Sequence, residues 1–189
     1  SMACFPLCPR CRGEYETPSD RRFHAEPVCC PACGPSLWLA GPGGKVLARQ
    51  SNALDAAREA LARGIIVALK GLGGFQLACR ADSEAAVAEL RRRKRRASKP
   101  LAIMVPDLAS ARLLVWLSPE DEALLASHRS PILLAPRRLP SSLAEGVAPG
   151  LEDIGVLLPT TPLHVELFQT KGYSSLVMTS GNRADERGL

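Results

Sequence analysis

Residues 90–105, LRRRKRRASKPLAIMV, join a helix that ends in cations to a short apolar strand. Six consecutive basic residues, 91–96, close an alanine-rich segment that begins at Ser83, a residue type that caps helices well. Lys99-Pro100 then stops the helix, because proline disfavours a helical residue before it, and the chain leaves as an extended strand. Positive charge at such a helix end suits a triphosphate, a nucleic-acid backbone or an acidic partner.

The basic run is predicted to have a packed side and a solvent side. Val87, Leu90 and Lys94 recur at helical spacing and share one face, so Lys94 is expected to lie against the core. Three arginines are expected to point to water: Arg91, Arg92 and Arg95. The alternative is that the whole run is a solvated charged surface, since the helix dipole stabilises cations at a C-terminus without any ligand.

Predicted helices and strands alternate along the rest of the chain. Helices are predicted at residues 52–63, 107–117, from 118 onward and at 162–170, and strands at 65–69, 75–79, 101–105, 132–135, 154–158 and 176–179. The apolar run 65–69 is expected to be buried on both faces, and Cys79 to be a small core residue. This alternation predicts an α/β fold with a mixed sheet.

Cysteines crowd the beginning of the chain, where six of the seven lie within the first 33 residues. Cys8-x2-Cys11 and Cys30-x2-Cys33 form two knuckles, and four thiolates complete a tetrahedron around Zn²⁺ with no position left for water. The pattern therefore predicts a structural zinc site that holds a segment too short to bury its own core. Three other residues stay open as substitute ligands: Cys4, Cys29 and His24.

The sequence divides into a small module and a larger domain. We expect a zinc module at residues 4–39, a linker at 40–50 that contains Gly41-Pro42-Gly43-Gly44, and an α/β domain at 51–189. With 189 residues and 46% hydrophobic content, the chain can bury one moderate core besides such a module.

Composition narrows the classes of function. The net charge of +5 and a pI of about 9.0 favour anionic ligands without requiring nucleic acid. Aromatic residues make up only 4% of the chain, too few for a stacking platform for single strands. No apolar run approaches the roughly 20 residues of a membrane span, so we expect a cytoplasmic protein with no membrane partner.

Two turns carry candidates for anion binding. Lys70-Gly71-Leu72-Gly73-Gly74-Phe75 follows a predicted strand, and its glycines let backbone N–H groups approach an anion. It is neither a Walker A loop nor a dinucleotide fingerprint, which needs glycine where Gln76 stands, and a tight turn between strands is the alternative. Thr179-Ser180-Gly181-Asn182 follows the last strand and suits a phosphate or ribose, or an ordinary turn.

Several ordered motifs resemble the hydrogenase maturation carbamoyltransferase HypF family. The segment CPRCRGEYETPSDRRFHAEPVCCPACGP is similar to the second of that family's two C4 zinc modules. The strings VALKGLGGFQLACRAD, K-x-R-x-x-K-P-L, GVLLPTTPLH and LVMTSGN are similar to its YrdC-like domain, a twisted mixed sheet with flanking helices. The Lys-x-Arg and Ser-x-Asn features are also similar to those of threonylcarbamoyl-adenylate synthases.

The resemblance implies an ATP-dependent reaction that converts carbamate, derived from carbamoyl phosphate, to carbamoyl-AMP. It places Lys94, Arg96 and Lys99 on the phosphates, with Lys94, Arg96 and Lys70 as the catalytic candidates. Thr179, Ser180 and Asn182 would bind phosphate or ribose, and Lys70 with the glycine turn would line the carbamate end. Mg²⁺ is expected with ATP, and a HypE-like protein as the carbamoyl acceptor.

The same resemblance implies that the YrdC-like domain is truncated at its C-terminus in this chain. The competing hypothesis is therefore a catalytically silent, zinc-stabilised scaffold whose basic face binds RNA or a protein partner. Saturable ATP binding would favour the enzyme, whereas salt-dependent RNA binding without ATP competition would favour the scaffold.

Overall fold

The computed structural model describes residues 6–25, 29–71, 73–170 and 172–182. The chain separates into two compact units, Ser1–Ala53 and Leu54–Leu189. The first unit holds helix α1 (Pro9–Glu16), strand β1 (Trp38–Ala40), the 3-10 turn η2 (Pro42–Gly44) and strand β2 (Val46–Arg49). β1 and β2 pair as an antiparallel hairpin across the segment that was expected to be a linker. Gly43 and Gly44 have positive φ angles of 72° and 79°, which explains why glycine stands at this turn.

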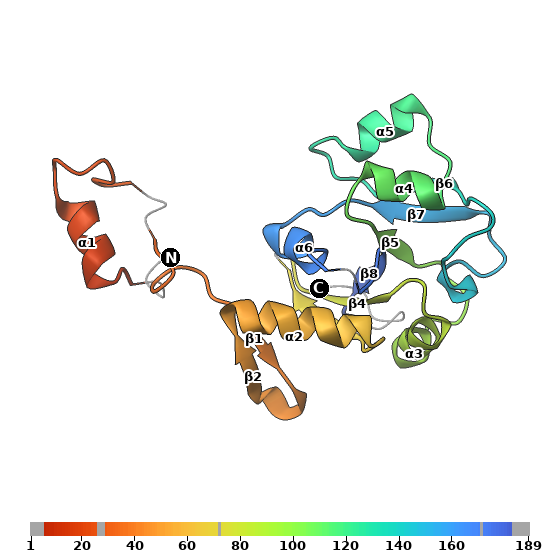
Figure 1. Cartoon of the computed structure of the whole chain (residues 1–189), viewed down its shortest axis with the longest axis horizontal. Coiled ribbons are helices and arrows are strands. Elements are labelled where there is room, and N and C mark those ends of the chain that lie inside the picture. Colours follow the sequence, from red (N-terminus) through yellow and green to blue (C-terminus); the bar gives the residue numbers. More distant parts are fainter. Residues whose placement is uncertain (1–5, 26–28, 72, 171, 183–189) are drawn as a thin grey trace. The chain divides into compact units, whose positions relative to one another are not determined.

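The second unit contains five helices and six strands, counted over its described residues and besides one 3-10 turn. Its elements are α2 (Gln50–Ala62), which begins in the first unit, β3 (Val67–Lys70), β4 (Phe75–Arg80), α3 (Glu84–Lys94), β5 (Ala102–Met104), α4 (Leu108–Leu114), α5 (Pro119–Leu125), β6 (Leu133–Pro136), η3 (Glu145–Val147), β7 (Asp153–Leu157), α6 (Pro162–Leu167) and β8 (Leu176–Ser180). Figure 1 shows α4 and α5 at the β6 and β7 end of the sheet.

The six strands form one sheet in the order β3-β4-β8-β5-β7-β6. Every neighbouring pair is antiparallel except β5 and β7, which are parallel. The predicted α/β class with a mixed sheet is therefore confirmed. The order also puts β3 at an edge, and its side chains alternate between buried and exposed. The expectation that this strand is buried on both faces is wrong: Val67 and Leu69 pack into the core on one face, whereas Ala68 on the other face is exposed.

Helix α3 ends as its sequence predicts and packs as its spacing predicts. The Ser83 hydroxyl caps the first turn by accepting from the Ala86 N–H, and Arg95 closes the helix in the left-handed conformation with φ 52°. Lys94 is only 4% exposed, which confirms its place on the packed side.

Arg91 does not point to water as expected. Its guanidinium donates to the carbonyl oxygens of Gly146, at 2.5 Å, and of Arg96, at 2.8 Å, so it ties α3 and the following loop to η3. Burial lowers its pKa. The error arose because helical spacing describes one helix and not the segment, 55 residues away, that covers it.

Two apolar clusters lie on the two faces of the sheet. One joins Val87 and Leu90 of α3 and Ala111 of α4 to alternate residues of the strands, among them Ile103 and Val156. The other joins Leu61 of α2 and Leu167 of α6 to the opposite set, among them Leu69, Ala78, Met104 and Leu176. Cys79 belongs to the first cluster and is fully buried, as predicted. None of the helices in the part of the chain that the structure describes is long and apolar enough to cross a membrane.

Candidate functional site

The four cysteines of the two knuckles come together in the first unit. The Sγ atoms of Cys8, Cys11, Cys30 and Cys33 all lie within 4.8 Å of one another. Cys8 immediately precedes α1, whose first turn carries Cys11, while Cys30 and Cys33 lie in the turn that follows position 28. Four sulfur atoms at this spacing match the ligand set of a closed tetrahedral zinc site, so these residues can hold Zn²⁺ without an open catalytic position.

The cluster favours thiolates at two of its positions. A backbone N–H of Cys8 lowers the pKa of the Cys33 thiol to about 6, and a backbone N–H of Ala32 lowers that of Cys30. Burial raises the pKa of Cys11, which is fully buried. A bound divalent cation deprotonates a coordinating thiol outright, which would offset the cost of burying the Cys11 thiolate.

The substitute ligands do not join this cluster where the structure describes them. His24 stacks on Phe23 with ring centroids 4.0 Å apart, and Cys29 is exposed. Cys4 lies outside the described residues. The clustered sulfur atoms include that of Cys30 and not that of Cys29, in agreement with the spacing of the knuckles.

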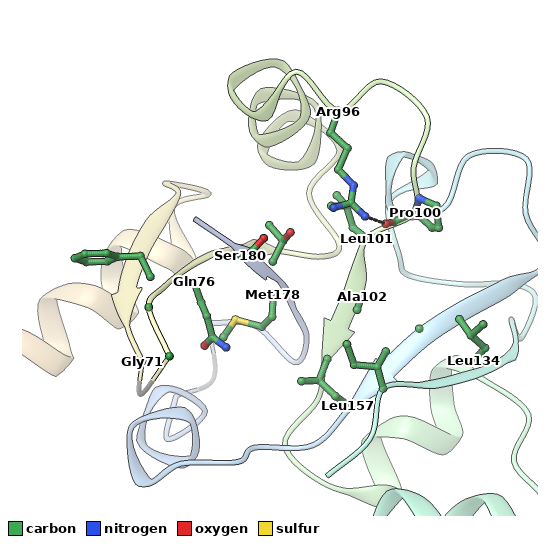
Figure 2. A pocket seen from close by; sticks show the side chains of 16 residues that line it. Gly71, Gln76, Arg96, Pro100, Leu101, Ala102, Leu134, Leu157, Met178 and Ser180 are labelled. Carbon is green, nitrogen blue, oxygen red and sulfur yellow. Dashed lines mark hydrogen bonds between the residues drawn. The ribbon is translucent and has the colours of Figure 1, made fainter. Parts of the chain in front are cut away.

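A pocket of about 560 Å³ opens in the second unit, on the face of the sheet that carries the α2 and α6 cluster. Strand register explains its floor, because residues that pair across strands point to the same side. Gln76 pairs with Ser180, Met178 with Ala102, and Leu134 with Gly155. Figure 2 shows labelled members of this row around the pocket. The full lining is Gly71, Gly73, Gly74, Phe75, Gln76, Arg96, Pro100, Leu101, Ala102, Ile132, Leu134, Gly155, Leu157, Met178, Thr179 and Ser180.

Small residues make the floor concave. A Cβ at position 155 would lie 3.2 Å from Cγ2 of Ile132 and 3.4 Å from Cβ of Ala102, so any side chain there would take up pocket space. Ile132 and Leu134 remain 60% and 69% exposed at this end. The result is an apolar shelf that can receive a flat ring.

The rim opposite the glycine turn carries a cation. Arg96 follows the end of α3, and its guanidinium donates to the carbonyl oxygens of Lys99, at 3.3 Å, and Pro100, at 2.5 Å. These bonds hold the guanidinium at the pocket edge (Figure 2). Thr179 and Ser180, at the end of β8, line the same pocket. Three of the predicted ligand-binding residues are therefore brought together.

Lys94 reaches this region from below the surface. Its Nζ donates to the carbonyl oxygens of Ser180, at 2.5 Å, and of Asn182, at 2.7 Å. Burial lowers the pKa of Lys94, with a smaller contribution from nearby Arg96. The ammonium group thus supports the backbone of the 180–182 turn, and it keeps a third N–H.

Two other predicted cations lie outside the lining. Lys70 places its Nζ 5.1 Å from the ring centroid of Phe75, and Lys99 is exposed. Asn182 contributes its carbonyl oxygen to the contact with Lys94 and is not part of the lining.

Sequence reasoning missed a contact between a buried histidine and a partly buried glutamine beside the glycine turn. His164 on α6 lies 2.9 Å from Gln76, between its Nε2 and the glutamine Oε1. The local signal was Thr161-Pro162, a cap followed by proline at the first helical position, which predicts that His164 sits in the first turn of a helix. Its contact with Gln76, 88 residues away, needed the folded sheet.

Two family models match the chain, one over the part that holds the cysteine cluster and the other over the part that holds the pocket. A family described as the HypF finger matches residues 7–40, and the Sua5/YciO/YrdC family, described as telomere recombination, matches residues 59–189. The chain belongs to the Sua5/YciO/YrdC family. Its larger unit is accordingly a YrdC-like domain, and its cysteine cluster coincides with the HypF finger.

Curated relatives of this YrdC-like chain are carbamoyltransferases named HypF. The Rhodobacter capsulatus protein is 52% identical over 182 residues, which cover 96% of this chain and 24% of that protein. A probable carbamoyltransferase HypF of Methanocaldococcus jannaschii is 36% identical over 140 residues, 74% of this chain and 18% of that protein. The resemblance to HypF is confirmed, and the chain spans about a quarter of the Rhodobacter relative.

Solved structures extend this likeness to three dimensions. The crystal structure of HypF from T. kodakarensis matches 98% of this chain and 24% of its own, with a TM-score of 0.84 and 44% identity. A full-length HypF in a phosphate- and nucleotide-bound form matches the same shares, with a TM-score of 0.80 and 41% identity. P. abyssi Sua5, at 22% identity and TM-score 0.60 over 69% of this chain and 40% of its own, shows the shared fold.

Proposed function

We propose that this chain is the ATP-binding, carbamoyl-adenylate-forming part of a HypF-like carbamoyltransferase. The observation that carries the proposal is one pocket that joins an apolar shelf at Gly155 and Leu134 to Arg96, Ser180 and the glycine turn. A shelf for a base, a cation for phosphates and a glycine turn are the parts that a nucleotide needs. The HypF names of the relatives and the nucleotide-bound HypF structure support it.

In this proposal the adenine ring lies on the shelf and the phosphates extend toward Arg96 and Ser180. A carbamate oxygen attacks the α-phosphorus, a new P–O bond forms, and the bond from the α-phosphorus to the bridging oxygen breaks, so pyrophosphate leaves with the electron pair. Arg96 offsets the negative charge that develops, and Ser180 with Thr179 offers hydroxyl groups to the phosphates. No side-chain nucleophile is needed, because phosphoryl-type transfers rely on positioning and electrostatics.

The two expected metal ions, zinc and magnesium, are bound by different groups in this proposal. Zinc belongs to the four cysteines, where it has a structural role. Magnesium is carried by ATP, since the described lining of the pocket contains no carboxylate. Transfer of the carbamoyl group to a HypE-like acceptor protein falls to parts of the enzyme beyond this pocket.

Isothermal titration of ATP with Mg²⁺ into the chain tests the proposal. Arg96→Gln and Ser180→Ala should each weaken binding more than about tenfold, equal to 1.4 kcal/mol. Arg93→Gln is the matched control: Arg93 is exposed, pairs with Glu89 at 2.6 Å and should leave the Kd unchanged. Release of pyrophosphate on addition of ammonium bicarbonate, which supplies carbamate, then tests the chemistry. No heat at millimolar ATP would reject the proposal.

The scaffold hypothesis draws less support from the basic run than its sequence suggested. Arg92 and Arg93 both pair with Glu89, at 2.7 and 2.6 Å, Lys94 is buried, and Arg91 donates to backbone carbonyls. Because the guanidinium of Arg96 also donates to backbone carbonyls, contacts within the protein engage five of the six cations, which leaves a weaker basic face for RNA.

A further inference from the structure

The carboxamide of Gln76 is a polar group in the wall of the pocket, on β4. Its Oε1 atom lies 2.9 Å from Nε2 of His164. His164 is only 3% exposed, so water cannot easily replace this contact. Figure 2 shows the Gln76 side chain between Gly71 and Met178, extending toward the pocket.

The second nitrogen of His164 fixes the direction of that hydrogen bond. The backbone N–H of Thr160 donates to Nδ1 at 3.3 Å, and the Thr160 hydroxyl oxygen lies 3.2 Å from the same atom and can also donate to it, so we assign Nδ1 as the acceptor of the imidazole. A neutral imidazole with Nδ1 as acceptor carries its proton on Nε2 and donates it. Burial lowers the pKa of His164, which keeps the ring neutral at physiological pH. Nε2 therefore donates to Oε1 of Gln76.

This arrangement decides which end of the Gln76 amide remains available. Because His164 occupies the oxygen, the NH₂ group is the end that can meet a ligand. Within the part of the chain that the structure describes, the Gln76 amide nitrogen has no hydrogen-bond partner. It lies beside the glycine turn, where the N–H of Gly71 donates to the Gly74 carbonyl at 2.7 Å and closes a tight loop. The pocket thus holds an oriented, neutral donor that matches an oxygen acceptor.

We propose that Gln76 is a specificity-determining residue, whose amide N–H groups bind an oxygen of the small carboxylate that ATP activates, and that His164 positions it. The proposal rests on the proposed function, in which that carboxylate is carbamate. It gives Gln76 the place at the carbamate end that the sequence had suggested for Lys70. The Lys70 ammonium lies over the Phe75 ring and outside the pocket lining.

Charge argues for the carboxylate rather than the triphosphate as the group at Gln76. The triphosphate carries several negative charges, and the cation of the lining is Arg96, across the pocket from the glycine turn (Figure 2). A neutral amide binds a small planar acceptor by hydrogen bonding without neutralising its negative charge, as a cation would. A carbamate so held keeps its nucleophilicity while its orientation is fixed.

Binding to the zinc-loaded chain of 189 residues tests this. The chain is labelled with ¹⁵N and titrated with ammonium bicarbonate, which contains carbamate at equilibrium, with ammonium chloride as the salt control. The side-chain NH₂ signals of Gln76 should shift and saturate. Gln76→Leu should weaken the apparent Kd about tenfold, reported by the backbone amide of Gly73, and Gln76→Glu should weaken it further by charge repulsion. Gln169→Leu, an exposed glutamine outside the lining, should change nothing.

Calorimetry with a non-hydrolysable ATP analogue separates this proposal from the function on which it rests. Two results together support the proposed function and the role of Gln76. Gln76→Leu should bind the analogue with a Kd within twofold of wild type, and it should bind bicarbonate-derived carbamate more weakly. Analogue binding without any shift at Gln76, or an equal loss of both ligands, overturns the role of Gln76 and leaves the nucleotide site. Failure of the analogue to bind the wild-type chain overturns the proposed function, and the role of Gln76 in it.

The positioning role of His164 has its own spectroscopic test. Long-range ¹H–¹⁵N correlations at pH 7 should show a neutral His164 protonated on Nε2. His164→Phe should collapse the two Gln76 NH₂ signals toward those of a free side chain while the ATP analogue still binds. An Nδ1-protonated or charged ring, or NH₂ signals unchanged in His164→Phe, would overturn the role of His164.

Discussion

Replacing Lys94 by methionine separates two roles of its ammonium group, support of the backbone and contact with a ligand. Methionine keeps an unbranched stem of similar length, so packing survives while the charge and its donors are removed. In the structure the Nζ atom donates to Ser180 and Asn182 at 2.5 and 2.7 Å from a side chain that is only 4% exposed.

The expected effect on stability follows from these two contacts. A hydrogen bond with one charged partner contributes about 1.5–3 kcal/mol, so two of them set an upper range of about 3–6 kcal/mol. Desolvation of the buried ammonium opposes this, as its lowered pKa indicates, and the substitution relieves that penalty. We therefore expect Lys94→Met to lower the free energy of unfolding by about 2 kcal/mol.

Urea unfolding followed by tryptophan fluorescence measures this loss. The chain has two tryptophans, Trp38 and Trp116, so a Trp38→Phe background lets Trp116 report on the larger unit alone. The matched control is Arg93→Met, the preceding exposed cation, which should leave the urea midpoint unchanged. A loss below about 0.5 kcal/mol in Lys94→Met, combined with tenfold weaker ATP binding, would refute the reasoning and show that the ammonium serves the ligand rather than the backbone.

Three further predictions concern the metal, the pocket floor and acid. Cys11→Ser removes a buried zinc ligand and should abolish stoichiometric zinc binding, whereas the control Cys29→Ser should retain it. Metal analysis after gel filtration measures the zinc content. Zinc retained in both variants would exclude this cluster as the site. Gly155→Val places a Cβ atom 3.2 Å from Cγ2 of Ile132. Calorimetry should show at least tenfold weaker binding of the ATP analogue, while the circular dichroism spectrum stays unchanged. An unaltered Kd would mean that the shelf does not hold the base. A hydrogen bond from Arg80 lowers the pKa of Asp82, so this pair stabilises the fold above the unfolded pKa near 4 and its contribution disappears as pH falls through the lower folded pKa. The urea midpoints of wild type and Asp82→Asn should therefore converge as the pH falls below about 4, and a constant difference would contradict this assignment.

Elements whose boundaries depend on neighbouring residues were predicted well. Ser83 begins α3 and Lys99-Pro100 lies beyond its end, as expected. Ser118 caps α5 through a capping box with Asp121, and proline occupies its first turn. These signals act within one helical turn, so the sequence carries them complete.

Errors arose where an element meets a distant partner. Arg91 sits on the side of α3 that helical spacing assigned to water, yet η3 covers it. Among the strands that the structure describes, the apolar run before the glycine turn pairs with β4 alone, which makes it an edge strand. The hairpin β1–β2 is local: the glycine-rich turn was recognised in the sequence, but not the strands on either side of it. The composition of a segment shows how apolar it is, but not how many strands will pair with it in the sheet.

The sequence by itself determined the two cysteine knuckles, the alternation of strands and helices, the cation-bearing end of α3 and the likeness to HypF, because each is written in residues close together or in ordered motifs. Only the tertiary structure decided that Ala102 and Gly155 make a pocket floor, that Lys94 supports the 180–182 turn, and that His164 orients Gln76. The physical reason is that register brings together side chains from strands far apart in the chain, and a hydrogen bond between residues 88 positions apart has no local pattern.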